Sequence, residues 1–296
     1  GENCDDFGGF ASLAAADDYT CGLTAQGIIH CWGDDPSRFQ ELPAAESFSQ
    51  LSGGAEFLCG LRTDGTVGCW GRCLSGICDP PGFDDFTAVS AGRGHACGLR
   101  TDGTIVCWGA NGAGQTDVLA GNYRKLALGY YHSCGLGVDG VITCWGRDAE
   151  GQRAPLADPE FAAGFQDLAA GGNYTCGVRV GGQPVCFGQR QADWEVFGVE
   201  TPGQAHFLAA GDDDVCIVRP DFTAYCSRDA ILLGDARVTT LAAGRSHVCG
   251  LALAGATWCW GSNGDGQSTV PAFAATAPPV CGNGRVEPAG GEACDD

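Results

Sequence analysis

Apolar and small residues alternate with polar ones in short segments that recur along the whole chain. Three of these segments read FTAVSAGRGHACGL at 86–99, FQDLAAGGNYTCGV at 165–178 and VTTLAAGRSHVCGL at 238–251. Alternation with a period of two is typical of β-strands. A glycine-rich loop follows downstream and is best preserved as CWGANGAGQ and CWGSNGDGQ. The pattern predicts an all-β fold made of repeated units.

Cysteines mark the period of this repeat. Seven cysteine pairs have a separation of ten, and successive pairs start 33 to 42 residues apart. In CGLRTDGTVGCW at 59–70, a three-residue turn at Thr63-Asp64-Gly65 places the two cysteines opposite each other at a non-hydrogen-bonded position of a hairpin. The α-carbons are close enough there for a disulfide. The predicted pairs are Cys21 with Cys31, Cys59 with Cys69, Cys97 with Cys107, Cys134 with Cys144, Cys176 with Cys186, Cys216 with Cys226 and Cys249 with Cys259.

A unit of this length cannot bury its own faces, so the units must pack against one another. Seven small sheets stacked radially form a β-propeller, with small residues such as Ala169-Ala170-Gly171 toward the axis. A solenoid would need polar capping repeats, and the first and last units here look ordinary. The sequence predicts a seven-bladed propeller over residues 7–272, with one hairpin disulfide per blade. Five units carry a tryptophan that suits packing between blades, at Trp32, Trp70, Trp108, Trp145 and Trp260.

The phrase CGLRTDGTIVCWGANGAGQ at 97–115 resembles a blade of the regulator-of-chromosome-condensation repeat family. The resemblance covers roughly residues 7–272 and implies a seven-bladed propeller. It is weaker in two blades, where Phe187 and Ser227 replace the tryptophan. Members of this family exchange nucleotide on a nuclear GTPase, inhibit enzymes or act as scaffolds. The resemblance therefore implies a fold and leaves the function open.

The two ends of the chain carry nearly the same six residues. GENCDD at 1–6 agrees with GEACDD at 291–296 in five of six positions. Residues 273–280 have the Ala/Pro composition of a linker. The sequence CGNGRVEPAGGEACDD at 281–296 resembles the start of the myxobacterial cysteine-rich repeat, a short extracellular module of bacterial surface proteins, and residues 1–6 match the tail of that module. We therefore expect a sequence with a period of 290 residues.

Five cysteines lie outside the seven hairpin pairs, and their expected partners can be assigned. Cys73 and Cys78 are expected to close a local loop, and Cys281 and Cys294 to close the terminal module. Cys4 then has no partner within the chain, which predicts a bond to the equivalent of Cys281 in a neighbouring copy. Cys4, Cys281 and Cys294 are accordingly the candidate residues for linking one unit to the next.

Amino-acid composition limits the cellular compartments and the classes of partner that we expect for this protein. The chain has 19 cysteines and no close CxxC or HxxxH pair, which favours disulfides in an oxidising compartment over zinc sites. The 36 Asp and Glu against 16 Lys and Arg give a net charge of -20, which disfavours binding to nucleic acid or to anionic lipid. No apolar run approaches the ~20 residues that cross a bilayer. We expect a processed or excerpted bacterial chain that is secreted or displayed at the cell surface.

Paired acids are the candidate cation ligands. The sequence requires no cofactor, and Ca²⁺ is the ion that adjacent loop carboxylates would bind. Internal runs occur at Asp17-Asp18 and Asp212-Asp213-Asp214. Acidic loops that simply keep the chain soluble are the alternative. The most persuasive set lies in the terminal modules, at Asn283, Glu287, Glu292, Asp295 and Asp296, and again at Glu2, Asp5 and Asp6.

Three histidines occupy one repeat position. His95, His132 and His247 lie two residues before a first blade cysteine, and the other units carry Tyr, Phe or Asp there. A slot filled by such different side chains predicts a packing and hydrogen-bonding position rather than a catalytic one. No GxSxG elbow, HExxH helix or phosphate-binding loop occurs, and we expect no enzymatic activity.

Two functions of different classes stay open. The first is an extracellular structural or adhesive protein whose copies assemble head-to-tail into a fibre or a tandem surface array. The second is a secreted binding propeller, a lectin or an enzyme inhibitor, that acts as a monomer on glycans or surface proteins. Its candidate anchors are Trp194, Phe197, Tyr130 and Tyr131, although these aromatic residues suit core positions equally well.

Overall fold

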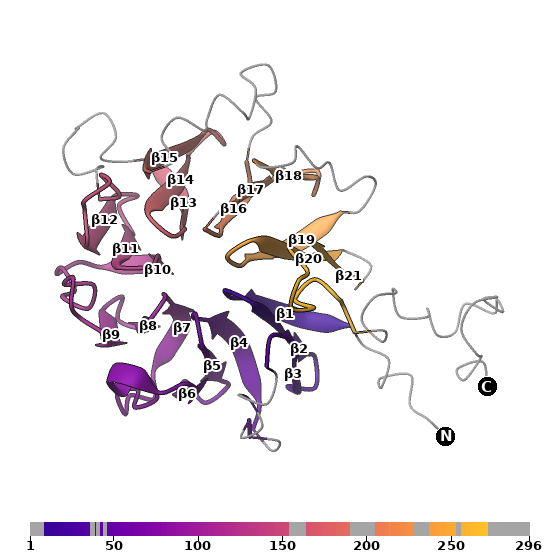
Figure 1. Cartoon of the computed structure of the whole chain (residues 1–296). Helices are drawn as coiled ribbons and strands as arrows, with labels where there is room; N and C mark the ends of the chain where they lie inside the picture. Colours follow the sequence, from indigo (N-terminus) through magenta and orange to yellow (C-terminus); the bar gives the residue numbers. More distant parts are fainter. Residues whose placement is uncertain are drawn as a thin grey trace, which may run out of the picture.

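The chain forms seven three-stranded antiparallel sheets around a central axis (Figure 1). The computed structural model describes residues 9–35, 39, 42–43, 46–153, 164–189, 205–212, 214–227, 237–252 and 256–271. Each sheet is one blade of three consecutive strands, and its first strand lies next to the axis. The predicted seven-bladed, all-β propeller is confirmed. The blades are β1 (Phe10–Ala15), β2 (Tyr19–Thr24) and β3 (Ile29–Gly33); β4 (Phe48–Gly53), β5 (Phe57–Arg62) and β6 (Val67–Gly71); β7 (Phe86–Ala91), β8 (His95–Arg100) and β9 (Ile105–Gly109); β10 (Tyr123–Leu128), β11 (His132–Gly137) and β12 (Ile142–Gly146); β13 (Phe165–Ala170), β14 (Tyr174–Arg179) and β15 (Pro184–Gly188); β16 (Phe207–Ala210), β17 (Val215–Val218) and β18 (Ala224–Cys226); and β19 (Val238–Ala243), β20 (His247–Ala252) and β21 (Thr257–Gly261).

The second and third strands of each blade form the predicted hairpin. In blade 2, the Arg62 N–H donates to the Thr66 carbonyl at 2.8 Å, and Gly65 closes the turn with a φ of 85°. That left-handed conformation is open to glycine at little cost. Asp64 accepts hydrogen bonds from the backbone N–H and the hydroxyl of Thr66, which hold the pKa of its carboxyl below the usual value. In blade 6 the left-handed position is taken by Phe222, whose φ is 67°.

One disulfide joins the second and third strands in every blade, as predicted. The paired cysteines lie directly opposite each other, with α-carbons 4.0–4.1 Å apart, as at a non-hydrogen-bonded position. Each bond closes a short loop and contributes about 2–3 kcal/mol by the chain-entropy estimate. In blade order the bonds join Cys21 to Cys31, Cys59 to Cys69, Cys97 to Cys107, Cys134 to Cys144, Cys176 to Cys186, Cys216 to Cys226 and Cys249 to Cys259.

The cysteines outside the hairpins fall into two groups. Cys73 and Cys78 form a further disulfide beside the 3₁₀ turn η3 (Leu74–Gly76), which confirms the predicted local loop. Cys4, Cys281 and Cys294 lie outside the described residues. Their pairing, within one chain or between copies, stays a prediction.

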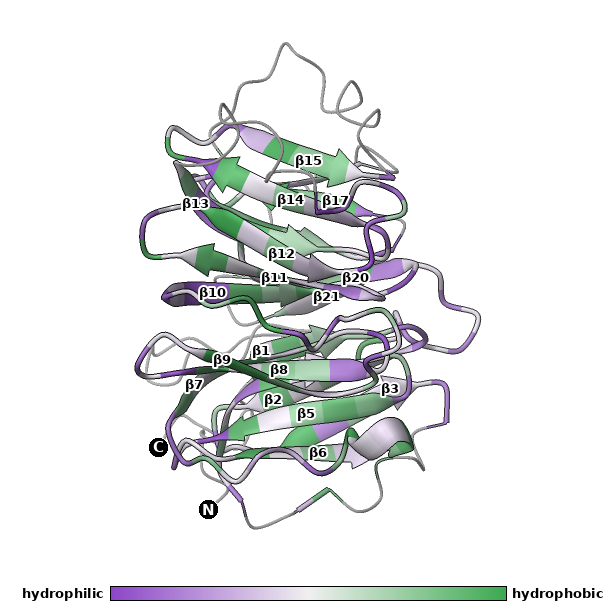
Figure 2. Ribbon diagram, turned by 90° about the vertical axis from the view of Figure 1, so that its left-hand side faces the viewer, coloured by the Kyte–Doolittle hydropathy of each residue, from purple (hydrophilic) through white to green (hydrophobic). Residues whose placement is uncertain are grey.

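The core lies between neighbouring blades and within the sheets, and in blades 1 to 5 an aromatic ring from the first strand covers a glycine of the second strand. Figure 2 shows the apolar residues concentrated in the strands and the hydrophilic ones in the connecting loops. In blade 3 the ring of Phe86 covers Gly98 of the next strand, and a Cβ at Gly98 would lie 2.4 Å from that ring. This contact explains the glycine that follows the first cysteine of the repeat, because a larger residue would displace the ring.

Tryptophan side chains connect blades where they are buried. Trp32, Trp108 and Trp145 each donate their indole N–H at 2.9 Å to a backbone carbonyl in the loop that precedes their blade or closes the ring. Trp70 is half-buried and packs edge-on against Phe48 of its own blade, with ring centroids 5.4 Å apart. The prediction of tryptophans between blades is therefore confirmed for the three buried rings.

Among the described residues, three junctions between blades contain a buried chain of a histidine, a hydroxyl group and a glutamine carbonyl. His95 Nε2 lies 2.8 Å from Ser133 Oγ of the next blade, and this hydroxyl donates to the Gln115 carbonyl at 2.8 Å. The serine hydrogen is used by that carbonyl, so Nε2–H of His95 is the donor to Ser133. The same arrangement recurs as His132, Thr175 and Gln152, and as His247, Thr20 and Gln267, the last of which closes the ring between blades 7 and 1.

The three histidines are fully buried, and no hydrogen-bond partner reaches their Nδ1 atoms in the described part of the protein. Burial lowers the pKa of His95 to about 3, and those of His132 and His247 to about 4. At neutral pH they are therefore uncharged structural groups. At the junction of blades 2 and 3, Phe57 and Ala96 belong to one buried apolar cluster instead.

Candidate functional site

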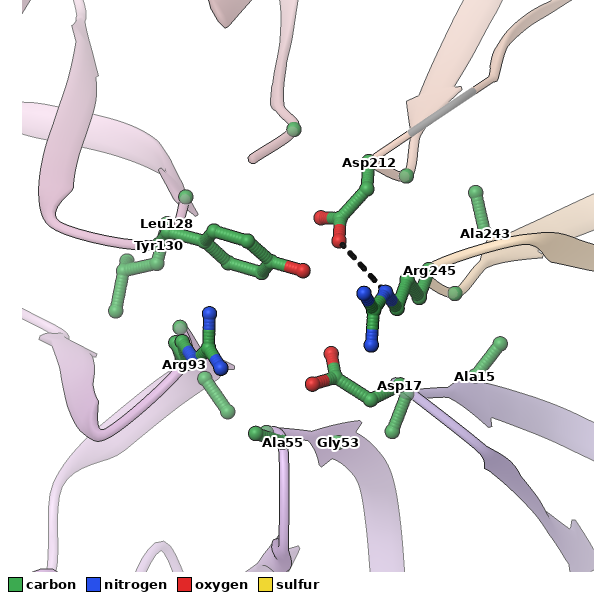
Figure 3. A pocket seen from close by; sticks show the side chains of 18 of the residues that line it. Ala15, Asp17, Gly53, Ala55, Arg93, Leu128, Tyr130, Asp212, Ala243 and Arg245 are labelled. Atoms are coloured by element: carbon green, nitrogen blue, oxygen red, sulfur yellow. Dashed lines mark ion pairs between the residues drawn. The ribbon is translucent and has the colours of Figure 1, made fainter. Parts of the chain in front are cut away.

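Side chains from all seven blades meet at one mouth of the central channel. The loop between the first and second strands of each blade turns there, and in six blades the residue four positions before the first blade cysteine lines the opening (Figure 3). The equivalent residue of blade 5, Gly172, lies beside Tyr130 and Asp212. We call these seven positions the axial ring. Its members are Asp17, Ala55, Arg93, Tyr130, Gly172, Asp212 and Arg245.

The backbone of the axial ring is held rigidly by close approach of the blades. A Cβ at Gly92 would lie 2.4 Å from the carbonyl oxygen of Gly129 in the next blade, so only glycine allows this spacing. Backbone bonds cross similar gaps, from the Tyr130 N–H to the Gly172 carbonyl at 3.0 Å and from the Arg245 N–H to the carbonyl of residue 16 at 3.1 Å. These backbone contacts thus fix the positions of the α-carbons that carry the side chains of the axial ring.

The charges of the axial ring alternate around the mouth. Arg245 lies between Asp212 and Asp17 in Figure 3, with its Nε 4.0 Å from an Asp212 carboxylate oxygen. The Arg93 guanidinium stacks over the Tyr130 ring at 4.8 Å from its centroid. Burial raises the pKa of Asp17 above the usual carboxyl value, while the positive charges of Arg93 and Arg245 oppose that shift.

The axial ring surrounds a small opening above a longer channel. The opening has a volume of about 70 Å³, which suits a functional group or a single small head group. The channel below it has a volume of about 270 Å³ and is lined by the first strands of the blades, including Leu13, Leu51, Leu126 and Leu241. A ligand at the mouth would therefore meet charged side chains first.

Three polar groups of the axial ring have no hydrogen-bond partner among the described residues. No acceptor there takes a hydrogen bond from the Arg93 guanidinium, no donor reaches the Asp17 carboxylate, and the Tyr130 hydroxyl makes no hydrogen bond. Other arginines do have such partners, as Arg100 has in its ion pair with Asp85 at 2.9 Å and Arg124 has in the Phe165 carbonyl at 2.9 Å. The free groups at the mouth are those that a ligand could satisfy.

The structure brings together only part of the predicted aromatic anchors. Tyr130 is in the axial ring, and Tyr131 beside it is partly exposed, with its ring centroid 6.2 Å from that of Tyr130. Trp194 and Phe197 lie outside the described residues. The two tyrosines are thus the described part of that predicted set.

The charged members of the axial ring were seen only partly in the sequence. Asp17 and Asp212, noted there as members of acidic runs, face the mouth. Arg93 and Arg245 were not predicted. Their shared position, four residues before a first blade cysteine, would have grouped them with Tyr130 and the two aspartates.

The calcium prediction stays untested. Within the described residues, no three His, Cys, Asp or Glu side chains are grouped so as to hold a metal ion. The described part of the chain also contains no helix with the length and apolar character needed to span a bilayer. The terminal set lies outside those residues and comprises Glu2, Asp5, Asp6, Asn283, Glu287, Glu292, Asp295 and Asp296.

Comparison with known families identifies the repeat. The family model described as the regulator of chromosome condensation (RCC1) repeat matches residues 86–115, 123–152 and 238–267. The chain contains RCC1-type repeats. The three matched repeats end on Gln115, Gln152 and Gln267, the glutamines of the buried polar chains. A search of curated proteins by sequence found no match.

Solved structures share this propeller over most of the chain. The entire ectodomain of the Physcomitrella patens receptor kinase CR4 is 27% identical with a TM-score of 0.72, covering 86% of this chain and 74% of that one. The CRINKLY WD40 ectodomain of the Arabidopsis thaliana receptor kinase ACR4 is 26% identical with a TM-score of 0.69, covering 86% and 96%. Yeast RCC1 (Prp20), solved bound to Kap60, is 17% identical with a TM-score of 0.52, covering 91% and 73%, and shows likeness in fold alone.

Proposed function

We propose that the chain is an extracellular, disulfide-stabilised binding module that presents its axial ring to a partner. The observation that carries this proposal is the convergence, on a rigid mouth, of charged and phenolic groups that make no hydrogen bond to the described part of the chain. Eight disulfides in the described residues favour an oxidising compartment. The two plant relatives named as receptor-kinase ectodomains support the same placement outside the cell.

A binding role suits the geometry better than catalysis. The axial ring offers two arginines, two aspartates and one tyrosine on loop ends, and loops held by a rigid scaffold are the usual place for recognition residues. Arginine and tyrosine are also enriched among residues that dominate binding energy. The proposed role is therefore recognition of a partner at the mouth by Arg93, Tyr130 and Asp17.

The proposal can be tested with the folded chain and a single charge variant. The chain is immobilised in a way that leaves the axial ring accessible. It is then screened against extracellular proteins and glycans, once as wild type and once as Arg93→Gln. Partners that use the axial ring should lose at least tenfold in affinity, as expected when a hydrogen bond to a charged group is removed. Arg100→Gln, which makes the same charge change at the other end of blade 3, should leave binding unchanged. Equal loss in both variants, or in neither, contradicts a role for the ring.

A head-to-tail array is the second candidate function. The observation that favours it is the match between residues 1–6 and 291–296, which lie outside the described residues. The test is mass analysis of native material under non-reducing conditions, together with a Cys4→Ser variant. Covalently linked multimers that disappear in the variant would support the array, and monomers in both would contradict it.

A further inference from the structure

The three axial-ring groups that have no hydrogen-bond partner in the described part of the chain differ in hydrogen-bonding capacity. Arg93 offers only donors, the Asp17 carboxylate offers only acceptors, and the Tyr130 hydroxyl can donate. All three point toward the same opening in Figure 3, where Arg245 lies beside Asp17 and across the opening from Arg93 and Tyr130. A ligand that satisfies the mouth must therefore carry a cationic or donating group and an anionic group within a small volume, since the opening is about 70 Å³.

Net charge favours the same kind of ligand. The two arginines and two aspartates of the axial ring sum to zero, while the whole chain carries a charge of -20. A simple anion would be repelled by the chain before it reached Arg93, and a simple cation would meet two arginines at the mouth. A ligand that is neutral overall but dipolar avoids both costs.

We propose that the axial ring binds the zwitterionic head group of an α-amino acid, an inference that rests on the proposed binding function of this mouth. The ammonium group donates to the Asp17 carboxylate. The carboxylate of the ligand accepts from the Arg93 guanidinium and the Tyr130 hydroxyl. Charge-assisted bonds of this type are about twice as strong as neutral ones, which offsets the small contact area.

The experiment uses glycine, the smallest molecule with this head group, and titrates it into the full chain by calorimetry or by NMR shifts of the ring residues. A dissociation constant on the order of 1 mM is expected for so few atoms. Acetate and methylamine, which each carry one of the two charges, should bind at least tenfold more weakly than glycine. A neutral methyl glycoside should not bind.

Matched variants locate the site. Asp17→Asn and Arg93→Gln should each weaken glycine binding at least tenfold, and Tyr130→Phe should weaken it by a smaller factor. Asp84→Asn and Arg100→Gln make the same charge changes at the opposite end of the blades and should bind glycine as the wild type does. Equal thermal unfolding midpoints across the variants would show that each is folded.

Several outcomes overturn the proposal. If acetate binds as well as glycine and Asp17→Asn strengthens it, the mouth is an anion site. If the glycoside binds and the ring variants abolish it, the site is a lectin site. If glycine does not bind while Arg93→Gln still loses a macromolecular partner, the amino-acid inference fails and the proposed function stands. If glycine does not bind and Arg93→Gln keeps every partner of the wild type, both the inference and the proposed function fail.

Discussion

Lowering the pH should destabilise the propeller through its three buried histidines. His95, His132 and His247 are neutral in the folded state because burial lowers their pKa values to about 3 or 4. Protonation of the neutral imidazole would add a hydrogen at Nδ1, and no acceptor among the described residues lies within hydrogen-bond distance of that atom. In the unfolded chain each imidazole titrates near pH ~6.5. Between these values the unfolded state binds more protons, so stability is complete above about pH 6.5 and falls as the pH drops toward 4.

The size of this effect follows from linkage. Each pH unit below about 6.5 removes about 1.4 kcal/mol of unfolding free energy per histidine, as long as the folded state stays unprotonated. At pH 5 the loss is about 2 kcal/mol for one histidine and about 6 kcal/mol for three, by the same relation. This is comparable with the whole stability of an ordinary domain, about 5–15 kcal/mol.

A natural junction of this protein supplies the test variant. His95→Phe combined with Ser133→Ala copies the Phe57 and Ala96 pair found between blades 2 and 3. Only side chains change, so the indole bond from Trp145 to the carbonyl of residue 115 can remain. Denaturant unfolding with intact disulfides is then measured from pH 7.5 to 4.5 for the wild type and the double variant. Titration of the many surface carboxylates is common to both proteins and cancels in the difference.

The double variant should lose stability less steeply, by about 1.4 kcal/mol per pH unit between about pH 6 and pH 4.5. Ser133→Ala alone keeps the histidine and should retain the wild-type slope, which separates titration from a change in packing. Parallel curves for the wild type and the double variant would refute the reasoning, because they would mean that His95 does not titrate differently in the two states.

Three further changes probe other parts of the scaffold. Phe222→Gly removes the strain of a non-glycine residue in the left-handed conformation and should raise the unfolding free energy by about 1 kcal/mol. Unchanged or lower stability in denaturant would mean that packing of the half-buried Phe222 ring contributes more than this strain costs. Replacing Cys73 and Cys78 together by serine should lower stability by about 2 kcal/mol without altering the other disulfides, as judged by mass after alkylation. Gly92→Ala places a methyl group 2.4 Å from the imidazole of His95 and should cost about 1–3 kcal/mol, with a wild-type melting temperature as the contrary result.

The hairpin and its disulfide could be predicted from the sequence because both are local. The turn at Asp64-Gly65 sets the register, and the register places Cys59 opposite Cys69. Blade number followed from counting the same spacing, and all seven sheets formed as expected. These features depend on residues within ten positions of one another, where turn chemistry and strand alternation decide the outcome.

The polar junctions were harder to predict because each contact joins one repeat to the next. The three histidines are followed, one blade later, by Ser133, Thr175 and Thr20 at the position before the first cysteine. The correlation is visible in the sequence only when successive repeats are compared with an offset of one. Where the histidine is replaced by an aromatic residue or aspartate, that downstream position holds Leu58, Ala96, Val215 or Val248.

The axial ring escaped prediction for a related reason. Arg93, Arg245 and Asp17 look like ordinary loop residues when each repeat is considered alone. They become a site only because seven loops converge on one axis, which brings residues more than 200 positions apart to the same opening. Radial closure, rather than any local motif, creates this chemistry.

The bond that closes the ring has a consequence for the connectivity of the chain. Blade 7 meets blade 1 through His247, Thr20 and Gln267, the same set of contacts that joins blades 3 and 4 inside the chain. No strand is exchanged across the seam between the described blades, because every blade is built from consecutive strands. The fold therefore does not depend on which blade is first in the sequence. Circular permutants whose termini lie at another junction between blades should form the same propeller.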